Sequence, residues 1–136
     1  AIEKGVAYFQ SCQSTDGGFG YTSSSGPNGP RTAIGCLVLA LAKKKETAQF
    51  QSAFNFLKKA SKSSSYYHYF LYYGSQAFFH ASPEEWNAWN RENIQELKQS
   101  QNPDGSWDGQ FGSTFSTATS LLSLALNYRF LPIYER

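Results

Sequence analysis

A seven-residue motif occurs twice in this chain, and it constrains the fold more than any other feature of the sequence. Residues 13–19 read QSTDGGF and residues 101–107 read QNPDGSW, so both copies have the pattern Gln-x-x-Asp-Gly-x-aromatic. Gln101 lies 88 residues after Gln13, which is twice 44. Such a period predicts a repeat protein in which each unit is one supersecondary element. The middle copy, near Leu57, has the look of a helix end but lacks the motif, so it is degenerate.

Each copy has the same order of elements: an amphipathic helix, a polar turn and a second helix that is apolar on nearly all sides. The first helices carry apolar residues at spacings that stay on one helical face. These residues are Ile2, Val6 and Phe9, then Phe50, Phe54 and Leu57, then Trp86, Trp89, Ile94 and Leu97. The second helices are expected over residues 32–42, 66–79 and 116–130. Because a helix that is apolar on all sides must be covered on all sides, we expect an inner layer of second helices and an outer layer of first helices.

Turn and capping residues indicate where these helices begin. The Asp-Gly pair suits a turn, since Gly supplies a positive φ and Asp bonds to the local backbone. Thr32 is expected to cap the first inner helix, and Ser116 or Thr117 the third. The segment SPEE at residues 82–85 has the spacing of a capping box with Pro at the first helical position, and it predicts the start of the third outer helix.

Length and composition indicate one globular domain spanning residues 1–136. We expect repeats at about 1–44, 45–81 and 82–130, followed by a tail at 131–136. A hydrophobic content of 40% with 16% charged residues excludes a disordered chain. A net charge of +2 is too weak to indicate nucleic acid as a partner. The longest apolar stretch, residues 34–42, is too short to predict a transmembrane segment.

Cysteine content and the start of the sequence bear on cellular location. Cys12 and Cys36 do not make a disulfide framework and are expected to be buried thiols. The sequence has no Met and begins inside a helical pattern, from which we expect a native start further upstream. The localisation is therefore left open.

The repeat resembles that of the prenyltransferase and squalene-cyclase family. Two groups of residues match the QW motif of that family: Gln101, Gly105 and Trp107, and, with Phe in place of Trp, Gln13, Gly17 and Phe19. The resemblance is closest to a group of uncharacterised bacterial toroid proteins, through residues 66–70, 86–90, 104–107 and 131–136. It implies an all-α fold, a partial α/α-toroid of three helical hairpins in two layers. Since a closed toroid in the family has roughly six hairpins, the chain would be the C-terminal half of a ring.

The residues that carry chemistry in that family do not occur in this sequence. The cyclases use a D-x-D-D acid, whereas the aspartates here, Asp16, Asp104 and Asp108, form no such cluster. The protein prenyltransferases hold zinc with Asp, Cys and His, but the two His and two Cys residues here have no ligand spacing. We therefore predict no catalytic residue, no metal and no cofactor in this chain. Whether a longer protein would be an enzyme of the prenyltransferase or terpene-cyclase type stays open.

The second inner helix is unusually aromatic. Its candidate ligand-binding residues are Tyr66, His68, Tyr69, Tyr72 and Tyr73. One interpretation is ring packing, with hydroxyl groups bonded to neighbouring residues. The other is an aromatic cavity wall, which would suit an isoprenoid because π-faces stabilise apolar chains and developing carbocations.

Two functions are compatible with the sequence. The first is a toroid that binds an isoprenoid or another apolar ligand in its aromatic inner cavity. The second is a helical-repeat scaffold for protein–protein interaction, as repeat folds often are. In either case the end hairpins are expected to need a neighbour, either further hairpins of the same chain or a second copy in a homodimer.

Overall fold

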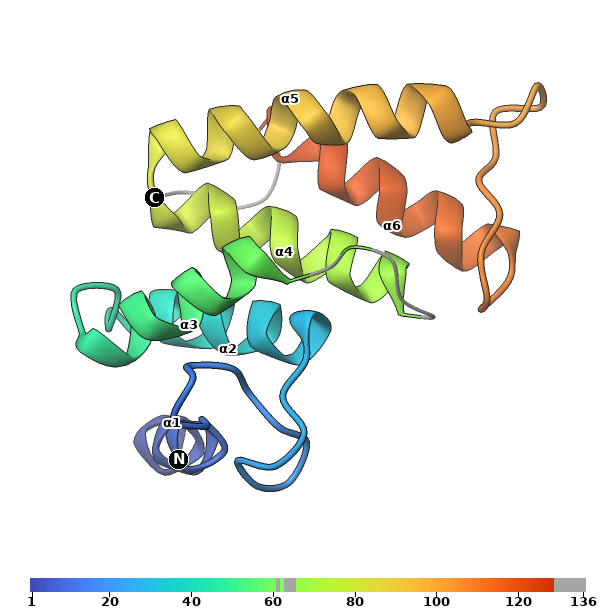
Figure 1. The fold of residues 1–136 in the computed structure, drawn as a ribbon. Helices are drawn as coiled ribbons and strands as arrows, with labels where there is room; N and C mark the ends of the chain where they lie inside the picture. The colour runs from blue at the N-terminus through green and yellow to red at the C-terminus, as the bar shows by residue number, and fades with distance from the viewer. Residues whose placement is uncertain (61, 63–65, 129–136) are drawn as a thin grey trace. The chain divides into compact units, whose positions relative to one another are not determined.

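The prediction of an all-α fold is confirmed by the computed structural model, which describes residues 1–60, 62 and 66–128 (Figure 1). Within that part of the chain no β-strand is present apart from isolated bridges at Phe19, with Gln13 and with Asn28. The helices are α1 (Ile2–Ser11), α2 (Gly29–Leu41), α3 (Ala48–Lys59), α4 (Tyr67–Ala81), α5 (Pro83–Ser100) and α6 (Ser113–Ala125). The toroid stays a prediction.

The chain divides into two compact units, Ala1–Lys62 and Ser63–Arg136. Helices α1, α2 and α3 belong to the first unit, and α4, α5 and α6 to the second. The boundary falls inside the expected second repeat, residues 45–81, because α3 and α4 lie in different units. The expected tail at 131–136 lies outside the described residues. None of the helices described is long and apolar enough to cross a membrane.

Helix α2 begins earlier than the sequence indicated, and the prediction that Thr32 caps it was wrong. Its N-cap is Asn28, whose side-chain oxygen accepts the Arg31 N–H at 3.0 Å. Thr32 lies inside the helix, where its hydroxyl donates to the Asn28 carbonyl at 2.7 Å and accepts the Phe19 N–H at 3.0 Å. Asn is at least as good a cap as Thr, so the Thr32 hydroxyl is available for a contact outside the helix.

Helix α6 also begins earlier, and neither Ser116 nor Thr117 caps it. Gly112 precedes its first residue with a φ of 90° and offers no side-chain cap. Ser116 Oγ donates back to the Gly112 carbonyl at 3.1 Å, which is the bond that a hydroxyl inside a helix makes. By contrast, the predicted start of α5 is confirmed, since Ser82 Oγ accepts the Glu85 N–H at 3.2 Å and Pro83 is the first helical residue.

The core of the first unit is formed by α2 packed against α3, together with the residues of the first motif. Phe50 and Phe54 of α3 stack with their ring centres 5.8 Å apart, and both side chains are buried. The ring of Phe19, also buried, lies 5.6 Å from that of Phe9 in α1. Cys12 and Cys36 are buried free thiols, as expected.

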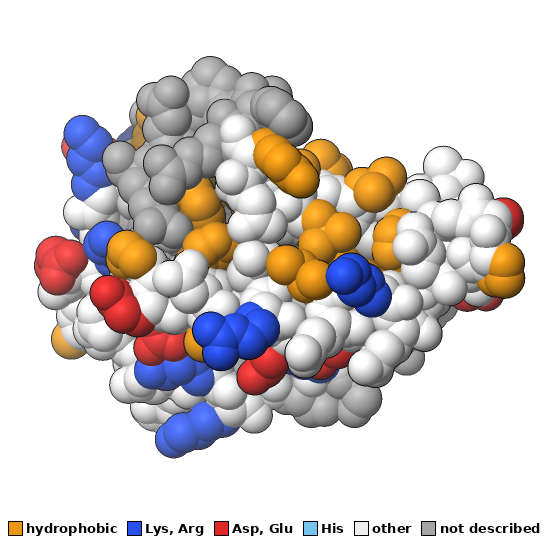
Figure 2. Space-filling view, turned by 90° about the horizontal axis from the view of Figure 1, so that it is seen from above, with side chains coloured by type: hydrophobic (Ala, Val, Ile, Leu, Met, Phe, Trp, Pro, Cys, Tyr) orange, Lys and Arg blue, Asp and Glu red, His pale blue; other side chains and the backbone are white. Residues whose placement is uncertain are grey.

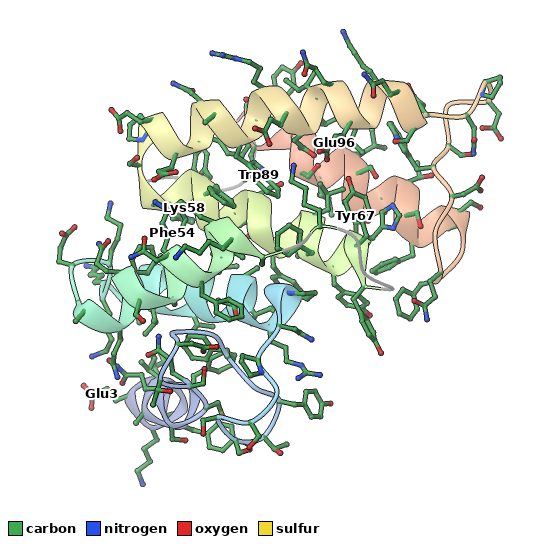
Figure 3. All side chains as sticks on the ribbon, viewed as in Figure 1. Glu3, Phe54, Lys58, Tyr67, Trp89 and Glu96 are labelled. Atoms are coloured by element: carbon green, nitrogen blue, oxygen red, sulfur yellow. The ribbon has the colours of Figure 1, made fainter. Side chains whose placement is uncertain are left out.

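The core of the second unit centres on Trp89 of α5, which packs against α4 (Figure 3). Its ring stacks on that of Phe78 at 4.5 Å and meets Phe70 edge-on at 5.7 Å. Its indole N–H donates to Ser75 Oγ at 3.1 Å, which satisfies the one polar group of the side chain. Helix α4 thus packs against α5 on one side and against α6 on another.

The expectation that α6 is buried on all sides was wrong. Its buried residues include the small polar side chains Ser116, Thr119, Ser120 and Ser123. Leu121 and Leu122, in contrast, are 53% and 38% exposed. Small side chains let a helix approach its neighbours closely, and a hydroxyl group can avoid an unpaired burial by bonding to its own helix, as Ser123 Oγ does to the Ser120 carbonyl at 2.7 Å. The Ser120 hydroxyl, in contrast, is buried with no hydrogen-bond partner among the described residues. Leu121 and Leu122 therefore lie on the outward side of α6.

Candidate functional site

Both copies of the repeated motif fold into the same turn. The Gln13 side-chain amide donates to the Gly17 carbonyl at 3.0 Å, and the Gln101 amide donates to the Gly105 carbonyl at 2.9 Å. Gly17 and Gly105 have φ values of 93° and 89°, which favour Gly over any other residue. The internal repeat seen in the sequence is therefore also a repeat of local structure.

The motif carboxylates are engaged within these turns. Asp16 Oδ1 accepts the Gly18 N–H at 3.1 Å, and Asp104 Oδ1 accepts the Ser106 N–H at 2.9 Å. The Ser14 hydroxyl and then the Gly18 N–H lower the pKa of Asp16, and the Ser106 hydroxyl and N–H lower that of Asp104. These hydrogen bonds favour the charged carboxylate, and they also hold the turn together. Both aspartates therefore have a structural role.

The motif aromatics connect each turn to both helices of its hairpin. The Phe19 N–H donates to Thr32 Oγ1 and the Trp107 N–H donates to Thr117 Oγ1, each at 3.0 Å. The Trp107 indole N–H also donates to the Leu97 carbonyl of α5 at 2.9 Å. Trp107 thus bonds to α5 through its ring and to α6 through its backbone.

The first motif also connects its hairpin to the following helix, α3. Gln13 Nε2 donates to the Gln49 carbonyl in the first turn of α3 at 2.8 Å. The turn lies so close to α3 that a Cβ on Gly17 would fall 2.4 Å from the Ser52 carbonyl oxygen, and one on Gly18 would fall 2.8 Å from the Phe56 ring. In the second motif Ser106 stands in place of Gly18. The second Gly of the first motif is therefore explained by the approach of α3 and of Pro27, whose Cβ would lie 2.6 Å from the added atom.

Four rings of the second unit form a cluster that we call the aromatic face: Tyr66, Tyr69, Phe111 and Phe115. Tyr69 lies 5.0 Å from Phe115 and 5.3 Å from Phe111, and Tyr66 lies 5.9 Å from Phe111, measured between ring centres. Tyr66 and Tyr69 come from the start of α4, Phe115 from the first turn of α6, and Phe111 from the loop before α6. Tyr66 remains 49% exposed and Phe111 44% exposed, so the face is open to a binding partner.

The other tyrosines that the sequence singled out continue along α4. Tyr72 and Tyr73 meet edge-on with ring centres 4.9 Å apart. Burial raises the pKa of Tyr73, and the neighbouring Tyr72 and Tyr69 raise it further. Tyr69 and Tyr73 are one helical turn apart, so these residues extend the aromatic face along the helix.

His68 lies apart from the aromatic face. Its side chain is buried beneath Gly109, where an added Cβ would fall 2.6 Å from the imidazole ring. Burial lowers the pKa of His68, which favours its neutral form. Its neighbour Tyr67 is turned toward α5, where burial and then the Glu96 carboxylate raise the pKa of Tyr67 to about 12 (Figure 3). His68 is thus a packed residue of this unit.

Sequence reasoning missed two members of the aromatic face and one pocket. Phe111 and Phe115 are four residues apart just before and after the start of α6, and this spacing was the available signal.

The pocket lies in the first unit and has a volume of about 380 Å³. Its lining residues are Asp16, Ser52, Asn55, Phe56, Lys59 and Ala60. It is the space between the first motif turn and the second half of α3.

Comparisons of the chain with protein-family models, with curated proteins and with solved structures gave no match. In the part of the chain that the structure describes, no group of three or more His, Cys, Asp or Glu side chains is arranged to hold a metal ion. The aromatic face is therefore the candidate site on geometry alone.

Proposed function

We propose that this chain is a helical-repeat module that binds an extended apolar ligand of the isoprenoid class on the aromatic face. The observation that carries the proposal is the clustering of four rings from three segments, two of them about half exposed. None of the four side chains is charged, so the face suits a ligand that offers hydrocarbon or cationic character and disfavours an anion.

The available surface supports binding of modest strength. An aromatic side chain has roughly 200 Å² of surface, so Tyr66 and Phe111, at 49% and 44% exposure, together offer about 190 Å² to a ligand. At about 25 cal/mol per Å², covering this area contributes about 5 kcal/mol, and the covered ligand surface contributes a similar amount. Association itself costs several kcal/mol, so we expect a dissociation constant of roughly 10–500 µM.

The second candidate function is a scaffold that binds a protein partner through the same face. The openness of the face favours this candidate, because small-molecule sites usually enclose most of their ligand, whereas open aromatic patches are typical of protein interfaces. The wider interpretation, in which the chain is the C-terminal half of a toroid related to prenyltransferases and terpene cyclases, remains a prediction from the motif.

Equilibrium dialysis with the isoprenoid alcohol farnesol tests the first candidate. We expect the parent chain to bind farnesol and Phe111→Ala to weaken binding by about tenfold or more, since the ring supplies about half of the available area. Tyr21→Ala removes an aromatic ring of the first unit that is 79% exposed, more than Phe111, and should leave binding unchanged. If the parent chain does not bind farnesol up to its solubility limit, the isoprenoid proposal fails and the scaffold becomes the better candidate.

A further inference from the structure

The repeated hydrogen bond at the motif aromatics allows α2 and α6 to be compared residue by residue. Thr32 of α2 and Thr117 of α6 accept the same backbone bond, from Phe19 and Trp107 respectively. Aligning the two helices on these threonines pairs each residue of α2 with the one 85 positions later. A position that is exposed on one helix can then be compared with its counterpart on the other helix, which can be buried.

The outward side of α6 corresponds to a buried side of α2. The apolar residues on this outward side, which we call the α6 stripe, are Ala118, Leu121 and Leu122, and all three are exposed. Their counterparts on α2 are Ala33, Cys36 and Leu37, and all three are buried. Helix α2 packs against α3 and α4 packs against α5, so each of these inner helices contacts the outer helix that follows it. Among the described residues no helix follows α6.

The reverse holds on the other side of the same helices. Three residues of α2, which we call the α2 stripe, are partly or largely exposed: Ile34, Val38 and Leu41, the last at 47%. Their counterparts on α6 are Thr119, Ser123 and Leu126, and all three are buried in the unit where α6 packs against α4. No inner helix precedes α2 in the part of the chain described.

Helix α1 is incompletely covered in the same way. Its apolar residues Ile2, Gly5, Val6 and Phe9 have the same spacing as Phe50, Ala53, Phe54 and Leu57 of α3. All four residues of α3 are buried, whereas Ile2 and Gly5 of α1 are exposed. An outer helix of this type thus has an apolar surface that α3 buries and α1 does not.

We propose that a second copy of this chain packs head to tail on the first, with the α2 stripe and α1 of one copy against the α6 stripe of the other. Each of these exposed surfaces has a buried counterpart on the matching helix, so the chain itself shows what kind of surface covers each. Hydrophobic side chains are grouped on the face seen from the α5 side (Figure 2). In the first motif, Gly18 leaves room for α3, whereas the second motif has Ser106 at the same position. A helix of the second copy would not approach the second motif turn as closely, so the proposed contact lies on the helix faces. It uses none of the residues of the aromatic face.

The test measures the mass of the chain in solution with two variants that each disable one end. Leu121→Glu places a charge in the α6 stripe, and Leu41→Lys places one in the α2 stripe, where a cation also suits the helix C-terminus. An unpaired charge in an interface weakens association by on the order of a hundredfold. Tyr21→Glu alters an exposed residue outside both stripes and is the matched control. Circular dichroism establishes that each variant is folded, as expected for changes at exposed positions.

Light scattering over a concentration series should show that the parent chain and Tyr21→Glu self-associate and that each of the two stripe variants alone is monomeric. An equimolar mixture of Leu121→Glu and Leu41→Lys should associate again, because one copy keeps an intact α2 stripe and the other an intact α6 stripe. A parent chain that stays monomeric at about 100 µM, a typical upper range for weak association, overturns the proposal. So does a Leu41→Lys variant that associates like the parent, since that result indicates contact between two α6 stripes. Neither result affects farnesol binding at the aromatic face.

Discussion

Replacing Trp107 by Ala should cost the second unit a large part of its stability. The side chain is only 4% exposed, and its indole N–H donates to the Leu97 carbonyl at 2.9 Å. Burying up to about 250 Å² of Trp surface contributes at most about 6 kcal/mol. Partial relaxation around the truncated side chain brings the expected loss to about 3–5 kcal/mol. Trp107→Phe keeps one ring and loses the indole bond, so it should cost about 1–2 kcal/mol.

Urea unfolding followed by tryptophan fluorescence measures this loss. The three tryptophans, Trp86, Trp89 and Trp107, all lie in the second unit, so in the Trp107 variants the remaining two still report on that unit. Since a loss of 3–5 kcal/mol approaches the whole stability of a small unit, Trp107→Phe keeps the measurement possible if Trp107→Ala is largely unfolded. Tyr21→Ala, which removes an exposed ring, is the control. If both Trp107 variants unfold at the urea concentration of the parent, the motif does not stabilise the hairpin and the reasoning is wrong.

Three further outcomes are expected. Ser82→Ala should lower the stability of the second unit by about 1 kcal/mol in urea unfolding, because it removes the cap on the Glu85 N–H; an unchanged midpoint would contradict the role of the cap. Burial lowers the pKa of His68, so the unfolded chain binds a proton more readily below about pH 6.5. Stability should therefore fall as the pH drops through this range, and thermal unfolding at several pH values should show a weaker dependence for His68→Gln than for the parent. Burial raises the pKa of Cys36 to about 12, so this thiol should resist iodoacetamide at pH 8 until urea unfolds the chain; rapid labelling of the folded chain would show that Cys36 is accessible.

The sequence by itself determined the features that depend on a few neighbouring residues. The Asp-Gly turns were predictable because Gly17 and Gly105 supply the positive φ and the carboxylates bond to the N–H two residues later. The start of α5 was predictable because the cap Ser82 and the Glu85 N–H that donates to it are three residues apart. The amphipathic helices α1, α3 and α5 were predictable because their apolar spacing matches the helical period.

The tertiary structure alone decided which side of α2 and of α6 is covered. Composition favoured burial of the leucines in α6, but the helix, which packs against α4 and α5, buries four of its Ser and Thr residues and leaves Leu121 exposed. Thr32 and Thr117 were mistaken for caps because a local pattern does not show their real partners. Their hydroxyl groups accept the backbone N–H of an aromatic residue 13 and 10 positions away, respectively.

The aromatic face depends on the same long-range packing. Tyr69 meets Phe111 only because α4 packs against α6, and His68, its neighbour in sequence, points instead beneath Gly109. A local pattern gives the period of a helix but not its rotation about its own axis, and that rotation is set by the side chains of distant segments that pack against it.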